Sequence, residues 1–220
     1  MRGGCLIFPG FDRFDISSNL MSNGCDSEYF EKVINFLNSQ SNSIIIIVGR
    51  YPLYFNEKNF DNNEGGVEPG GGEYRFIKDG NFNSIQESFK STILKLSNKN
   101  KIILVYPVPE VGWHVPRKLN SVLLFKSQKE IDNYLIEKNY LTTSYEVFKL
   151  RNNLSFEVLD SIKNNNIHRV YPHKIFCNSK IKNRCITHDS QNIFYYDYIH
   201  LLGKGSMSLV SLIINKVKSL

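Results

Sequence analysis

The sequence predicts an α/β fold in which a parallel sheet carries helices on both faces. Two apolar runs rich in β-branched residues, Ile44–Val48 and Lys101–Tyr106, show no alternation of apolar and polar residues. Such runs are typical of strands that are covered on both faces, as in a parallel sheet between helices. Segments with helical periodicity separate the strands, and this order favours parallel strands joined by right-handed crossovers.

The remaining elements continue this alternation along the chain. Helices are indicated by apolar residues that recur on one face, or by a capping box, in which a Ser and a Glu three residues later bind the first free amides. A third, weaker strand is expected at His168–Tyr171, which makes three strands where such a sheet usually has about five. The expected helices cover Glu28–Gln40, Ser84–Leu96, Ser127–Leu135, Ser144–Asn164 and Ser206–Leu220.

One long stretch, Tyr51–Asn83, is expected to be irregular because it contains Gly65-Gly66, Pro69 and Gly70-Gly71-Gly72. It follows the first strand at its carboxyl end, where open α/β sheets bind ligands. Its glycines match neither G-x-G-x-x-G nor a P-loop, so neither a phosphate site nor a nucleotide cofactor is expected. We interpret the stretch as a flexible flap.

The composition is that of a globular chain. Of its 220 residues, 41% are hydrophobic and 22% are charged, which excludes a disordered chain, a coiled coil and a collagen-like repeat. No apolar run approaches the roughly 18–20 residues that span a bilayer, and the first ten residues lack the apolar core of a signal peptide. The net charge of +6 comes from scattered lysines in an Asn-rich chain, which favours a genomic composition bias over nucleic-acid binding.

The four cysteines form two pairs along the chain, Cys5 with Cys25 and Cys177 with Cys185. No C-x-x-C occurs, so zinc-ribbon and thioredoxin spacings are absent. The spacing fits two disulfides that staple loops in an oxidising compartment. It fits four unrelated buried thiols in a cytosolic protein equally well.

Asp197 and His200 form a D-x-x-H pair in an aromatic-rich segment near the end of the chain. An Asp that accepts a hydrogen bond from His Nδ1 fixes the tautomer and stabilises the imidazolium, so that the other ring nitrogen acts as a general base on a serine. D-x-x-H is also frequent by chance, and the alternative is a loop Asp beside a partly buried His.

The order of the motifs resembles the SGNH-hydrolase-like domain that is fused to the C-terminus of acyltransferase family 3 membrane proteins. In that family a strand that is followed by an Arg and an aromatic residue precedes a P-x-P-E-x-G segment, a Cys pair with short spacing and a D-x-x-H-L block, which comes before the last helix. An earlier Cys pair precedes them. The matching residues here are Cys5 and Cys25, Ile47–Tyr54, Pro107–Gly112, Cys177 and Cys185, and Asp197–Leu201.

This resemblance implies a three-layer SGNH or flavodoxin-like sheet within one domain over residues 1–220, with Asp197 and His200 as catalytic residues. It implies O-acetylation of cell-surface polysaccharide, by acyl transfer or ester hydrolysis, without a cofactor. The partners it implies are an acyl donor delivered by a membrane acyltransferase domain and a glycan acceptor. It also favours two disulfides, with Cα atoms about 4.4–6.8 Å apart, and a location on the periplasmic or cell-surface side of a membrane protein.

Two features depart from the family's pattern. Leu202 stands where the family has the Ser of D-x-x-H-L-S. The family's nucleophile lies in a G-D-S segment after the first strand, and Ser27, Ser190 and Ser206 each lack that strand-to-turn context. We therefore expect the sheet to lack its first strand, the domain to be incomplete at its N-terminus, and the oxyanion hole to lack a backbone amide.

Three functions remain open from the sequence. The chain is an acyltransferase or esterase domain that retains the Asp-His half of the triad, or a binding-only domain that has lost its nucleophile, or a fragment whose first strand and serine are encoded upstream. We expect little activity from the chain alone in each case. The other histidines (His114, His168, His173 and His188) lack metal-ligand spacing, so no metal site is expected.

Overall fold

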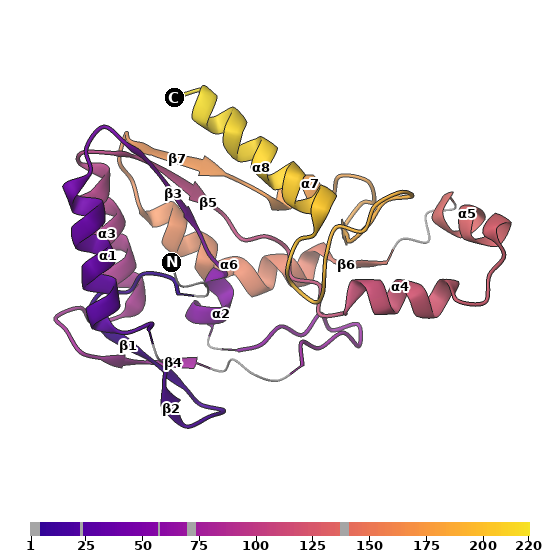
Figure 1. Ribbon diagram of the computed structural model, residues 1–220, viewed down its shortest axis with the longest axis horizontal. Coiled ribbons are helices and arrows are strands. Elements are labelled where there is room, and N and C mark those ends of the chain that lie inside the picture. The colour runs from indigo at the N-terminus through magenta and orange to yellow at the C-terminus, as the bar shows by residue number, and fades with distance from the viewer. Residues whose placement is uncertain (1–4, 23, 57, 70–73, 137–140) are drawn as a thin grey trace.

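The computed structural model describes residues 5–22, 24–56, 58–69, 74–136 and 141–220. Strands and helices alternate along most of the chain, as the sequence predicts (Figure 1). In chain order the elements are β1 (Phe11–Asp15), β2 (Leu20–Met21), α1 (Ser27–Ser39), β3 (Ile44–Val48), α2 (Tyr51–Phe55), β4 (Tyr74–Lys78), α3 (Ile85–Ser97), β5 (Lys101–Val105), α4 (Val115–Leu123), α5 (Gln128–Ile136), β6 (Thr142–Ser144), α6 (Tyr145–Ser161), β7 (Ile167–Val170), α7 (His173–Phe176), β8 (Arg184–Ile186) and α8 (Gly203–Lys218).

The central sheet is parallel and has the order β3-β5-β7. Ile45 pairs with Ile102, and Leu104 with Arg169, so the three strands run side by side and end at one edge. The three strands expected from the sequence are therefore confirmed, and the third begins one residue earlier than predicted. All five expected helices are present. The capping boxes expected at Ser84 and Ser127 are confirmed, because the amides of Glu87 and Glu130 donate to the hydroxyl oxygens of Ser84 and Ser127.

Helices cover both faces of this sheet, as predicted. On one face, the inward side chains of β3 and β5 pack against α1, α3 and α6, where Phe30, Phe89 and Leu159 are fully buried. On the other face α8 packs over Ile103, Val105 and Val170 through its own apolar residues. α8 lies on the opposite side of the strands from α1 and α3 in Figure 1. The arrangement is the three-layer α/β sandwich expected from the strand and helix order.

The prediction that β3 is covered on both faces is wrong. Its residues alternate between buried and exposed, and Ile44, Ile46 and Val48 are 39%, 43% and 52% exposed. The reason is that α8 packs over β5 and β7 only, and no described strand pairs with the outer edge of β3. β5 lies in the middle and is buried on both faces, as its apolar run predicts. The central sheet thus has one open edge with an apolar face beside it.

The stretch at 51–83 is more ordered than its glycines suggest. Its start forms α2, whose five residues are all buried, and its end forms β4. β4 pairs antiparallel with β1, which also pairs with β2, in a second small sheet. Phe8, Tyr54, Phe76 and Phe89 pack their rings edge to face and join this sheet to the central core. The interpretation of the whole stretch as a flap is therefore wrong, while part of its glycine-rich run lies outside the described residues.

Both expected cysteine pairs are disulfides. The Cα atoms of Cys5 and Cys25 are 5.5 Å apart, and those of Cys177 and Cys185 are 3.8 Å apart, which is closer than expected. The second bridge joins the end of α7 to β8, which pairs with β6. Disulfides persist in oxidising compartments, so the bridges fit an extracytoplasmic location. Within the described ranges no helix is both long and apolar enough to cross a bilayer.

His173 lies in an aromatic cage at the start of α7, where Tyr145, Phe148 and Tyr171 surround its ring. The side chain is buried, and its Nδ1 atom has no hydrogen-bond partner. Burial, reinforced by the positive charge of Lys174, lowers the pKa of His173 from 6.5 to about 4. Burial disfavours the charged ring, so folding keeps this histidine neutral.

We predict that this histidine makes folding sensitive to mild acid. The unfolded chain takes up the proton near pH 6.5 and the folded chain near pH 4, so the free energy of unfolding falls as the pH falls through that window. His173→Phe fills the cage without a titrating group. Urea unfolding between pH 7 and 4 should show a shallower loss for His173→Phe than for the unchanged chain. Identical pH profiles for the two proteins would contradict the assignment.

Candidate active site

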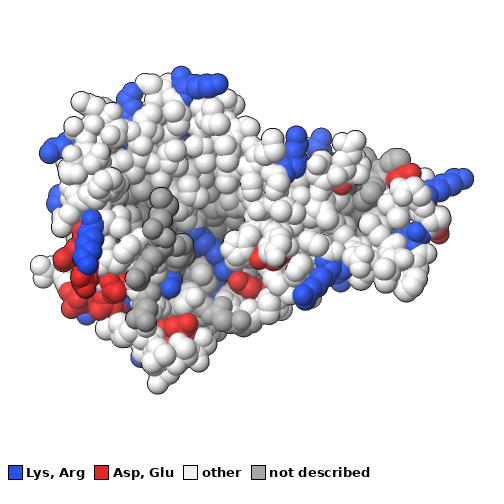
Figure 2. Space-filling model, viewed as in Figure 1, with Lys and Arg blue, Asp and Glu red and all other residues white. Residues whose placement is uncertain are grey.

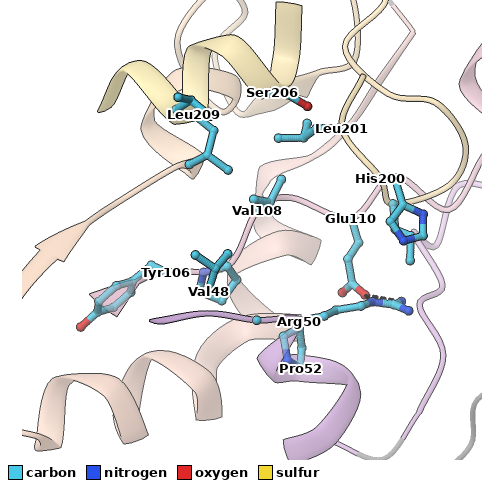
Figure 3. Close-up of a pocket in the computed structure, with 14 residues that line it drawn as sticks. Val48, Arg50, Pro52, Tyr106, Val108, Glu110, His200, Leu201, Ser206 and Leu209 are labelled. Carbon is cyan, nitrogen blue, oxygen red and sulfur yellow. Dashed lines mark hydrogen bonds and ion pairs between the residues drawn. The ribbon is translucent and has the colours of Figure 1, made fainter. Parts of the chain in front are cut away.

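A pocket of about 480 Å³ opens at the carboxyl ends of β3 and β5. Ligands of open α/β sheets bind at this edge, because the loops that follow parallel strands meet there. Three segments and one helix form its walls, as Figure 3 shows: the exits of β3 and β5, the loop that holds His200, and the start of α8. The lining residues are Val48, Gly49, Arg50, Pro52, Tyr106, Pro107, Val108, Glu110, Ile199, His200, Leu201, Ser206, Leu209 and Val210.

Asp197 and His200 are brought together by the tight loop that precedes α8. The loop is closed by a backbone hydrogen bond from Tyr196 to the carbonyl of His200, 2.8 Å long. The Asp197 carboxylate lies inside the loop, where its Oδ1 atom accepts from the amides of Ile199 and His200 at 2.9 and 2.8 Å. Its Oδ2 atom lies 2.7 Å from His200 Nδ1. The local backbone thus fixes the carboxylate against the imidazole.

The charge of this pair is set by those contacts. Partial burial acts against ionisation of Asp197, but the two amides and the His200 ring together hold the pKa of Asp197 below its usual value. An ionised carboxylate only accepts hydrogen bonds, so His200 Nδ1 carries a proton, and it is the neutral ring's Nε2 atom that has the lone pair. The Asp197 side chain is 22% exposed and the His200 side chain is 71% exposed. Asp197 therefore holds the imidazole at its Nδ1 side, and the rest of the ring is open to solvent and to the pocket.

The loop is docked on the P-x-P-E-x-G segment. The amides of Val111 and Gly112 both donate to the carbonyl of Tyr198, at 2.9 and 3.2 Å. The buried hydroxyl of Tyr195 donates to the carbonyl of Pro109 at 2.9 Å. Through these contacts, the segment that follows β5 supports the His200 loop.

Four charged residues beneath the pocket form an ion network that the sequence did not predict. Glu110 Oε1 accepts from Arg50 Nε at 2.6 Å, and Glu110 Oε2 accepts from Arg151 Nε at 2.8 Å. Arg50 in turn makes a two-pronged contact with Glu68. The Glu110 side chain is only 4% exposed and that of Arg151 9%. Burial opposes the charge of Arg50, but its two glutamate partners outweigh this and raise its pKa.

The sequence offered a partial signal for this network. Arg50 and Glu110 each follow a buried strand, where a charged residue reaches the ligand-binding edge of a parallel sheet. Nothing local indicated Glu68, which lies in a glycine-rich stretch, or Arg151, which lies in the middle of α6. Only the fold brings Glu68 and Arg151 together with the segments that follow β3 and β5.

The three serines considered from the sequence lie in different places. Ser206 lines the pocket from the first turn of α8 (Figure 3). Ser27 begins α1, where its amide donates to Asp12. Ser190 is exposed in the loop between His188 and Ile193. Neither of these two lines the pocket. Among the described residues, no serine hydroxyl hydrogen-bonds to the His200 ring.

The other histidines do not join Asp197 and His200. His168 lies within β7, and His173 occupies the aromatic cage. His188 is buried and accepts a hydrogen bond from the amide of Leu141 at 2.9 Å, so it has a structural role in a loop that the sequence suggested to be polar. His114 caps α4 without a side-chain hydrogen bond and packs against Tyr198. Within the described ranges, no group of three or more His, Cys, Asp or Glu residues is arranged to hold a metal ion.

Leu202 occupies the position that precedes α8. Its backbone has the extended geometry of a helix N-cap, with φ −118° and ψ 144°, but its side chain makes no capping hydrogen bond. A serine in this geometry would accept a hydrogen bond from an amide of the first turn. The departure from the D-x-x-H-L-S pattern is therefore a change in helix capping, next to the His200 loop and outside the Asp197–His200 contact.

The comparison with family models identifies the domain. The model for the SGNH domain fused to AT3 domains matches residues 1–215. The chain belongs to the SGNH domain family. A search of curated proteins found no match, and a search of solved structures found none either. The match confirms the resemblance drawn from the motifs, and its AT3 fusion indicates a membrane acyltransferase domain as the partner of this SGNH domain.

We predict that Glu110 holds the pocket together. Glu110→Gln keeps the shape of the side chain but removes its charge, which leaves Arg151 buried without a carboxylate. Removing one partner of a buried ion pair costs about 3–5 kcal/mol of stability, so urea unfolding should show a loss of this size. Glu28→Gln breaks the exposed pair between Glu28 and Lys32 and is the matched control. A Glu110→Gln variant as stable as the Glu28→Gln variant would contradict the prediction.

Proposed function

We propose that this SGNH domain takes part in O-acetylation of cell-surface polysaccharide, by acyl transfer or ester hydrolysis, with Asp197 and His200 as its acid–base pair. The observation that carries the proposal is the 2.7 Å contact between Asp197 Oδ2 and His200 Nδ1 at the mouth of a pocket on the carboxyl edge of the sheet. This is the geometry in which an imidazole accepts a proton at Nε2 and an aspartate stabilises the charge that results.

The proposed chemistry is a two-step acyl transfer. His200 Nε2 removes the proton of a serine hydroxyl as the serine oxygen attacks the carbonyl of the acyl donor, and the protonated ring then gives that proton to the leaving group. The resulting ester on the serine is attacked by a glycan hydroxyl, or by water, whose proton again passes to His200 Nε2. The bond from the acyl carbon to the serine oxygen then breaks, and His200 gives this proton to the departing serine oxygen, which restores the serine hydroxyl and the neutral ring. Asp197 stays ionised throughout and stabilises the imidazolium formed in each step.

We propose that the serine comes from a strand outside the described sheet, which makes the domain over residues 1–220 incomplete at its N-terminal side. The open edge of β3 supports this proposal, because an unpaired edge with exposed apolar neighbours favours the addition of a further strand. A strand added parallel to β3 would end level with Val48. Val48 and Gly49 line the pocket, so the turn after such a strand would enter the space in front of His200.

The first test concerns the chain alone. We predict near-background hydrolysis of an activated acetyl ester such as p-nitrophenyl acetate, equal for the unchanged chain and for His200→Ala. Loss of the nucleophile in a serine protease lowers turnover by about a million-fold, so an isolated Asp–His pair should be nearly inert. Turnover that both His200→Ala and Ser206→Ala abolish would contradict the prediction and would identify Ser206 as the nucleophile.

The second test is made in the cells that produce this protein, with each substitution introduced into the gene. The O-acetyl content of extracted surface polysaccharide, measured by proton NMR, should fall to background with His200→Ala and stay unchanged with His168→Ala. Unchanged acetylation in the His200→Ala cells would favour the alternative, a binding-only domain without catalytic function.

A further inference from the structure

A second recessed surface lies beside the catalytic loop and is built around Trp113. The indole borders two shallow hollows of about 380 and 280 Å³, which we call together the Trp113 groove. Trp113 and Lys118 line both of them. The groove lies at the start of α4, on the arm formed by α4 and α5, where Figure 2 shows Lys and Arg side chains at several places. The residues that matter here are Trp113, His114, Arg117, Lys118, Ser121 and Tyr198.

The indole is held in place by close backbone packing. A Cβ atom on Gly66 would lie 2.5 Å from Trp113 Nε1, so only glycine fits under the ring edge. Gly112 has φ +77°, and a Cβ atom there would lie 2.4 Å from the Gly66 carbonyl oxygen. The buried Asn62 fixes this contact, because its side chain donates to the carbonyl of Val111 and accepts from the amide of Gly66. An aromatic ring held this firmly is a preorganised binding surface.

The charge of the groove is positive. Arg117 and Lys118 are exposed, and within the described part of the chain neither forms an ion pair with a carboxylate. The Lys118 ammonium lies over the Trp113 ring, 5.7 Å from its centre, so it borders the face of the indole. A third cation, Arg184, is already paired with Glu64, and no acidic residue among those that the structure describes lines either hollow. Two cations therefore remain available to a ligand beside an aromatic platform.

The Trp113 groove is connected to the catalytic pair through Tyr198. This residue lines the groove and stands between Asp197 and His200 in the sequence. Its ring contacts His114 at 5.5 Å between centroids, and its carbonyl accepts the amides of Val111 and Gly112. Two residues span at most about 7 Å of chain, so the Cα atom of Tyr198, at the border of the groove, lies within about that distance of the Cα atom of His200.

We propose that the Trp113 groove binds a saccharide that carries a carboxylate, with the apolar face of a sugar ring on Trp113 and its carboxylate on Arg117 and Lys118. The apolar C–H face of a sugar packs on an aromatic ring for the same reason that other apolar surfaces do, and arginine matches a carboxylate in two-pronged geometry. The role of this sugar as the acyl acceptor rests on the function proposed above. The binding itself does not require that the chain be active.

The test is a binding measurement on the purified chain. Calorimetric titration with trigalacturonic acid, and with a tetrasaccharide of alternating glucuronic acid and N-acetylglucosamine, probes two acidic backbones. The trimethyl ester of trigalacturonic acid has the same backbone without charge and is the matched ligand control. At least one acidic oligosaccharide should bind, and the ester should bind at least about tenfold more weakly than its acid, the difference expected from losing hydrogen bonds to a charged group.

The variants separate the two parts of the groove. Trp113→Ala should weaken binding of the acid at least about tenfold, and Trp113→Phe, which keeps a ring, should weaken it less. Arg117→Gln combined with Lys118→Gln should remove the preference for acid over ester. Lys126→Gln removes one positive charge outside the lining residues and should leave binding unchanged. Thermal unfolding of each variant checks that it is folded.

Three results would overturn the proposal. The first is that neither acidic oligosaccharide binds at millimolar concentration. The second is that acid and ester bind equally, and the third is that the Trp113 and Arg117–Lys118 variants bind as well as the Lys126→Gln variant. Because binding is measured without turnover, none of these results bears on the catalytic role proposed for Asp197 and His200. In the same way, failure of that catalytic role would not change the result of this titration.

Discussion

A glutamate buried between two arginines determines the shape of the candidate active site. Glu110 follows β5, Arg50 follows β3 and Arg151 lies on α6, so one carboxylate joins two strand exits to the helix that covers them. Glu68 adds the segment between α2 and β4 through Arg50. Buried charges are unfavourable unless each is paired in good geometry. The segments around the pocket must therefore adopt this one arrangement or leave a charge unpaired.

The Asp197–His200 pair depends on that arrangement indirectly. The segment that begins at Pro107 is fixed through Glu110, and it supports the His200 loop through the amides of Val111 and Gly112 and through Pro109. Asp197 is then oriented by two amides of its own loop. The imidazole is thus positioned by backbone contacts on one side and open on the other. This is the arrangement that a general base needs when its substrate group arrives from another segment.

The sequence predicted the parts of the fold that local patterns encode. The apolar runs of β3 and β5, the capping boxes of α3 and α5 and the short spacing of Asp197 and His200 each depend on neighbouring residues, and each matches the structure. The ion network was not predicted because Glu68 and Arg151 come from segments far apart in sequence. The exposure of β3 was not predicted because an apolar run does not indicate whether its strand lies in the middle or at the edge of a sheet. The pairing of β4 with β1 was not predicted because the glycines before β4 led to an irregular stretch being expected there.

The central claim is that Asp197 holds the His200 ring with its proton on Nδ1 and a free lone pair on Nε2. Nitrogen-15 NMR of the imidazole, recorded at a pH at which the ring is neutral, tests it most directly because the two tautomers have distinct nitrogen shifts. The account predicts that His200 is protonated at Nδ1 in the unchanged chain and that Asp197→Ala shifts the population toward the Nε2-protonated form. The same tautomer distribution in both proteins would contradict it.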